Sequence, residues 1–138
     1  MSKFKIILSE FDSKNGVSFV SLKYKGETFI GWAAFNPNDE VPVSSFLGCR
    51  IAEKRAAIKA LKHEYKKALA EYDAIITFIS DYGSTYEPDT YVTKGIAQKW
   101  SELQDRKRII DNIQKSIQVD IDNYYKFQEE RKKKKESC

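Results

Sequence analysis

Two long helical patterns fill most of the chain after residue 50 and restrict its architecture more than any other feature. Apolar or aromatic residues recur at steps of three and four from Ile51 to Tyr82, and again from Ile96 to Tyr124. Such spacing places one apolar stripe along one side of each helix. A small sheet cannot cover stripes of this length. The pattern therefore predicts helix-on-helix packing of the coiled-coil kind, and we expect that packing between chains, in a homo-oligomer.

The first 35 residues show a different pattern, which is typical of strands. Residues 3–9, 17–24 and 27–35 alternate at period two and are rich in β-branched and aromatic side chains. Gly16 and Gly26 each follow a polar residue between two of these runs, which indicates tight turns. We therefore expect a three-stranded antiparallel meander.

The alternation also predicts which side chains share a face of each strand. The residues expected to lie together are Phe4, Ile6 and Leu8 in the first strand, Val20, Leu22 and Tyr24 in the second, and Thr28, Ile30, Trp32 and Ala34 in the third. Gly31 interrupts the third strand. A glycine there indicates either a bulge or a close approach of another backbone.

These patterns together predict an α+β protein with a three-stranded, or slightly larger, antiparallel meander followed by two long helices. We expect a single domain over residues 1–130 and a basic tail over residues 131–138. The domain is expected to divide into the meander and its loop at 1–43, a long helix at 44–82, a loop at 83–93 and a second long helix at 94–130. Ser44 or Ser45 is expected to cap the first helix.

Charge and hydropathy bear on the partners of the chain. The 138 residues carry a formal net charge of +4, and the run from Arg131 to Glu136 accounts for all of it, which leaves a neutral body. We expect that run to be a solvated, mobile tail and nucleic acid to be an unlikely partner. No apolar stretch approaches the roughly 20 residues of a membrane span, and the N-terminus lacks signal-peptide features. We expect a cytoplasmic protein, in the host cytoplasm if phage-encoded, with no membrane partner.

Residues suited to catalysis or metal binding are scarce. Cys49, Cys138 and His63 are the only cysteines and histidine. Zinc sites need several such ligands, and a nucleophile needs a nearby base. We therefore expect no catalytic residue, no metal site and no cofactor, and we do not expect an enzyme.

Residues suited to binding an anionic ligand are better represented. Seven basic residues against two acidic ones lie between Arg50 and Lys67, and arginine is suited to bidentate contact with phosphate. A loop rich in tyrosine and threonine joins the helices and could stack on a base and bind ribose hydroxyls. The candidate ligand-binding residues are Arg55, Tyr82, Tyr86, Thr90, Thr93, Arg106 and Arg108. In a simple hairpin, Arg55 and Arg108 are offset by about 16 Å along the axis, so a site that uses both would lie between protomers.

The layout of sheet and helices resembles the phage-encoded Thoeris anti-defence type 1 family over nearly the whole chain. The stretch GETFIGWAAFNPNDEVPVSSFLGCRIAEKRAAIKAL also has the character of small phage proteins. The resemblance implies a sponge that captures a cyclic ADP-ribose isomer without degrading it, in pockets between protomers. Its implied ligand-binding residues are an arginine in each helix, Arg55 and either Arg108 or Arg106, and the aromatic and polar segment 82–93.

Two other functions fit the same sequence. The first is a protein-targeting phage inhibitor, such as an anti-CRISPR protein, whose helices would block a nuclease or its DNA site. The second is a small nucleic-acid-binding phage accessory protein that uses the basic run, for which steep salt dependence is expected.

Overall fold

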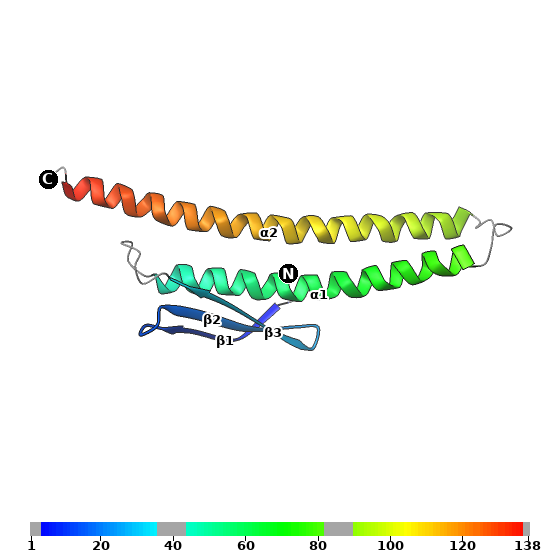
Figure 1. The fold of residues 1–138 in the computed structure, drawn as a ribbon, viewed down its shortest axis with the longest axis horizontal. Helices are drawn as coiled ribbons and strands as arrows, with labels where there is room; N and C mark the ends of the chain where they lie inside the picture. Colours follow the sequence, from blue (N-terminus) through cyan, green and yellow to red (C-terminus); the bar gives the residue numbers. More distant parts are fainter. Residues whose placement is uncertain (1–3, 36–43, 82–89, 137–138) are drawn as a thin grey trace. The chain divides into compact units, whose positions relative to one another are not determined.

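The computed structural model describes residues 4–35, 44–81 and 90–136, where three strands precede two long helices (Figure 1). The elements are β1 Phe4–Asp12, β2 Val17–Tyr24, β3 Glu27–Ala34, α1 Ser45–Asp81 and α2 Thr90–Glu136. The strands form one antiparallel sheet in the order β1-β2-β3. This layout confirms the expected α+β class, with a three-stranded meander followed by two long helices.

Both hairpin turns lie where the sequence predicts them. Lys25 and Gly26 have φ of 50° and 83°, and positive φ at both central positions gives a turn whose twist matches the strands it joins. In the other turn Gly16 has φ of 66°, and its N–H donates to the carbonyl of Asp12 at 2.8 Å. The carboxylate of Asp12 also accepts the backbone N–H of Asn15 at 3.3 Å.

The buried face of the sheet is centred on β2. Its members there are Ser18, Val20, Leu22 and Tyr24, all buried. On β3 the buried residues are Gly31 and Ala33, whereas Ile30 and Trp32 are 53% and 56% exposed. Thr28, Ile30, Trp32 and Ala34 do share a face, but it is the outer one, because Gly31 and Ala33 lie on the face that packs against α1.

The first strand departs from simple alternation. Ile6 pairs with Leu22 but Leu8 pairs with Ser21, so the register shifts by one residue between them. Directly opposed residues on neighbouring strands point to the same face. Ile6 therefore lies on the helix-facing side and Leu8 on the outer side, and the expectation that they share a face is wrong.

A row of small residues on α1 meets the sheet. Gly48, Ala52, Ala56 and Ala60 recur every fourth residue and all are buried, so they share one side of the helix. A Cβ added to Gly31 would overlap the carbonyl oxygen of Ala52 and the backbone nitrogen of Ala56. The close backbone approach expected at Gly31 is therefore confirmed.

The helix ends differ from expectation mainly in α2. Ser44 caps α1, since its Oγ accepts the N–H of Leu47 at 3.1 Å. The second helix begins at Thr90 and ends at Glu136, so residues 131–135 belong to the helix and not to a separate tail. Lysine, arginine and glutamate are good helix formers, which explains the extension. Neither helix, over its described residues, contains a segment apolar enough to cross a bilayer.

The chain divides into two compact units. Residues 1–60 and 112–138 form the first unit, and residues 61–111 form the second. In the first unit α1 and α2 are joined by ion pairs. The Nε of Arg50 lies 3.1 Å from Oδ2 of Asp120, and Nζ of Lys54 contacts the same oxygen.

The second unit consists of the remaining parts of the same helices. Arg106 Nε lies 3.6 Å from Glu64 Oε1, and the rings of Tyr72 and Trp100 have centroids 5.5 Å apart. Leu103 is buried between the charged and aromatic contacts along α2. These contacts join α1 and α2 of the same chain within each unit. Assembly into a homo-oligomer stays a prediction.

Candidate functional site

Part of the predicted site lies in the segment between the helices. Tyr82 and Tyr86 fall outside the described residues, and so does the side chain of Thr90, the first residue of α2. Thr93 is exposed in the first turn of α2.

The predicted arginines fall in different units. Arg55 belongs to the first unit, and Arg106 and Arg108 belong to the second. Arg106 pairs with Glu64 and lines a small hollow of about 100 Å³. Arg108 is exposed, and its Nη2 lies 2.5 Å from Oδ1 of Asp105 on the same helix. Neither unit alone therefore contains a predicted arginine from each helix.

Arg55 lines a larger hollow beside the free edge of β3. The hollow measures about 490 Å³, which lies within the usual size range of small-molecule sites. We call it the edge groove. Its lining residues are Gly31, Trp32, Arg55, Ile58, Lys59, Gln114, Ile117, Gln118 and Ile121, all in the first unit.

Two cations of α1 are held on the backbone of β3 in this groove. Nη1 of Arg55 donates to the carbonyl of Trp32 at 2.9 Å, and Nζ of Lys59 donates to the carbonyl of Ile30 at 2.6 Å. A guanidinium has five N–H donors and an ammonium has three. Both groups therefore keep most of their donors for a ligand while the backbone carbonyls fix their positions.

Helix and strand geometry explains why both cations reach the edge. Lys59 follows Arg55 by four residues, which is a rise of about 6 Å along α1. The two carbonyls lie two residues apart on β3, which is about 6.6 Å along the strand. The close contact at Gly31 brings the helix near enough to the strand for this match to operate.

The other residues that line the groove are uncharged, and they include both polar and apolar side chains. Gln114 and Gln118 come from α2, and Nε2 of Gln118 donates to Asp122 at 2.9 Å, which leaves its amide oxygen as an acceptor. Ile58 and Ile117 are buried beside them. None of the described lining residues is acidic, so the groove carries two positive charges that no lining residue offsets.

Trp32 contributes its backbone to the groove. Strand alternation places its side chain on the face opposite Gly31, and it pairs there with Phe19 of β2. The aromatic surface that a nucleotide base prefers is therefore displaced from the cations to the outer face of the sheet.

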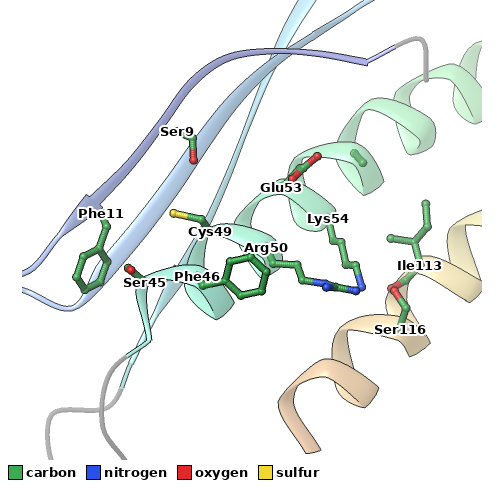
Figure 2. Close-up of a pocket in the computed structure, with 11 residues that line it drawn as sticks. Ser9, Phe11, Ser45, Phe46, Cys49, Arg50, Glu53, Lys54, Ile113 and Ser116 are labelled. Atoms are coloured by element: carbon green, nitrogen blue, oxygen red, sulfur yellow. The ribbon is translucent and has the colours of Figure 1, made fainter. Parts of the chain in front are cut away.

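A second hollow lies beside the start of α1 in the same unit and measures about 820 Å³. Figure 2 shows Arg50 and Lys54 extending from α1 towards the part of α2 that carries Ile113 and Ser116. Aromatic side chains and hydroxyl groups from β1 and α1 also line it, namely Ser9, Phe11, Ser45 and Phe46. This hollow thus offers the aromatic surface that the edge groove lacks.

Its charges, however, are balanced. Asp120 binds both Arg50 and Lys54, and Glu53 also lines the hollow. The two cations are therefore matched by two carboxylates. The cations of this hollow would therefore contribute less binding free energy to an anionic ligand than those of the edge groove, where no described lining residue is acidic.

Comparisons of the chain with protein-family models, with curated proteins and with solved structures find no match. The resemblance to the Thoeris anti-defence family therefore stays a prediction. Within the described part of the chain, no three histidine, cysteine or acidic side chains gather as metal ligands.

Arg55 was predicted as a ligand-binding residue from the sequence, whereas Lys59, Gln114 and Gln118 of its groove were not. The spacing of Lys59 could have indicated its role, because it follows Arg55 by about one helical turn within the basic segment and so lies on the same side of the helix. Gln114 and Gln118 also share one side of the second helix, but nothing in their spacing shows that this side faces Arg55. The basic segment itself divides, since Arg50 and Lys54 bind Asp120 whereas Arg55 and Lys59 bind β3.

Proposed function

We propose that this protein binds a nucleotide immune signal, a cyclic ADP-ribose isomer, and sequesters it without degrading it. The observation that carries the proposal is the pair of cations in the edge groove. Arg55 and Lys59 are fixed on the carbonyls of Trp32 and Ile30, and no acidic residue lies among the described residues that line the groove.

The chemistry of the ligand fits these groups. A cyclic ADP-ribose isomer has two phosphate charges, which would lie against Arg55 and Lys59. Its base and ribose hydroxyls can exchange hydrogen bonds with the amides of Gln114 and Gln118. The described lining side chains bind and orient, and none of them is a nucleophile paired with a base. Sequestration is therefore the form of action that we propose.

Calorimetry with a series of related ligands tests this proposal. A cyclic ADP-ribose isomer should bind with sub-micromolar affinity, which corresponds to more than about 8 kcal/mol. Adenosine, which lacks the phosphates, should bind at least tenfold more weakly. Chromatography of the ligand after release by heat should recover it unchanged. Turnover to linear ADP-ribose would contradict sequestration, and equal affinity for adenosine would contradict the role of the cations.

A further inference from the structure

The two free edges of the sheet are treated differently. On β3, Lys59 and Arg55 bind the carbonyls of Ile30 and Trp32. Side chains that occupy edge carbonyls prevent another strand from pairing there. The free edge of β1 carries three consecutive aliphatic residues, Ile6, Ile7 and Leu8, which are 48%, 52% and 44% exposed. An exposed edge strand of this kind is a template for pairing with another chain.

The register shift in β1 decides which of its side chains share a face. Lys5 lies opposite Lys23 before the shift, and Glu10 lies opposite Phe19 after it. Lys23 and Phe19 are four residues apart on β2 and point to the same face. Lys5 and Glu10 therefore lie together on the outer face of the sheet. In a regular strand, residues five apart would point to opposite faces.

These two charges make β1 self-complementary. The midpoint between Lys5 and Glu10 along the chain lies between Ile7 and Leu8, where the register of β1 shifts. An antiparallel copy of β1 centred on that midpoint places Lys5 opposite Glu10 of the partner subunit, and the pair occurs twice. Opposite charges at directly opposed positions stabilise strand pairing, whereas a charge opposite an apolar residue does not.

We infer that two copies of this chain pair through β1, antiparallel, with Lys5 facing Glu10 of the partner subunit, to form a continuous six-stranded sheet. Ile6 then lies opposite Ser9 of the partner subunit, and Ile7 opposite Leu8 of the partner subunit. Charged residues on an edge strand ordinarily discourage pairing. Here this register neutralises them, so the strand favours its own copy over an unrelated strand. The edge groove lies at the other edge of the sheet and stays open.

Charge reversal with rescue tests the pairing. Analytical ultracentrifugation of the full chain should detect a dimer of two 16.0 kDa chains. Lys5→Glu and Glu10→Lys should each weaken the dimer at least tenfold, because each places two like-charged pairs across the strands. The double variant, Lys5→Glu with Glu10→Lys, should restore it. Lys14→Glu makes the same charge change in the exposed turn and should leave the dimer unchanged.

A second measurement does not depend on variants. A zero-length carbodiimide cross-linker should join Lys5 to Glu10 between isotopically light and heavy chains. Within one strand the two residues are about 16 Å apart, too far for this reagent. A monomer at millimolar concentration would overturn the inference. So would a dimer that survives both single reversals, a double variant that fails to dimerise, or the absence of this cross-link from a dimer.

Discussion

Gly31 of β3 lies directly against Ala56 of α1, such that a Cβ on Gly31 would be 3.0 Å from the Cα of Ala56. The same Cβ would lie closer still to the carbonyl oxygen of Ala52 and the backbone nitrogen of Ala56, so this is a direct approach of helix and strand backbones. It also brings the neighbouring Arg55 within reach of the carbonyl of Trp32. The position of the edge groove therefore depends on a residue that contributes no side chain.

Gly31→Ala should destabilise the protein by about 1–3 kcal/mol, the usual cost of overpacking a core. The added methyl group would overlap the backbone at Ala52 and Ala56, which cannot rotate away. Chemical denaturation followed by circular dichroism measures the change.

Gly95→Ala is the matched control for that substitution. Apart from its chain neighbours and the backbone of its own helical turns, no atom of the described residues lies within 4 Å of a Cβ added at Gly95, which is in α2. Alanine there should stabilise the protein by about 0.5–1 kcal/mol through helix propensity. Equal effects of the two substitutions would contradict the close approach at Gly31.

The strands and helices could be predicted because their signals are local. Turn residues such as Gly26 and the alternation of β2 depend only on neighbours in the sequence. The buried face of β3 could not be predicted in this way. Hydrophobicity alone predicts that Ile30 and Trp32 are buried. The residues that are buried instead are Gly31 and Ala33, because only small residues fit where β3 packs closely against the row of small residues on α1.

The candidate site was only partly predictable for a related reason. Arg55 stands out by its residue type and by the basic segment around it. Its partners depend on tertiary packing, since Trp32 precedes it by 23 residues and Gln118 follows it on the other helix. The pairing of Arg50 and Lys54 with Asp120 is equally nonlocal.

Asp120→Ala should lower the stability of the first unit by about 1–2 kcal/mol. Its carboxylate is 14% exposed and is the common partner of Arg50 and Lys54. Removing it leaves both cations without that partner. Asp122→Ala, which removes only an exposed contact with Gln118, should change stability by less than about 0.5 kcal/mol. Urea unfolding compares the two variants, and equal losses would contradict the role assigned to Asp120.

The first turn should show a pH dependence centred on Asp12. The side-chain amide of Asn15 lies 2.7 Å from its carboxylate and holds its pKa below the ordinary value, with the backbone N–H groups of Asn15 and Lys14 contributing. Because folding lowers this pKa, the stabilisation is present above the unfolded-state pKa. It is lost as the pH falls through the folded-state pKa.

NMR titration of the Asp12 carboxyl group measures this effect. Asn15→Ala should move the titration midpoint upward, because the strongest donor to the carboxylate is removed. An unchanged midpoint in that variant would show that Asn15 does not set the pKa.

Arg108→Ala tests whether the second unit contributes to binding. Arg108 pairs with Asp105 on its own helix and does not line the edge groove. We therefore expect the Kd for a cyclic ADP-ribose isomer to change less than twofold, as measured by calorimetry. A tenfold loss would instead support a site between protomers that uses an arginine from each helix, as the family resemblance implies.

Calorimetric titration of a cyclic ADP-ribose isomer into the wild type, Arg55→Ala and Lys59→Ala is the most direct test of the proposed site. Loss of one charged hydrogen-bonding group should weaken binding by about 1.5–3 kcal/mol, or roughly 10- to 150-fold. Lys62→Ala, an exposed cation on α1 outside the groove, should bind as the wild type does. Thermal melts would show that all variants are folded. Affinities that do not change in Arg55→Ala and Lys59→Ala, or a wild-type protein that binds no cyclic ADP-ribose isomer, would contradict the account.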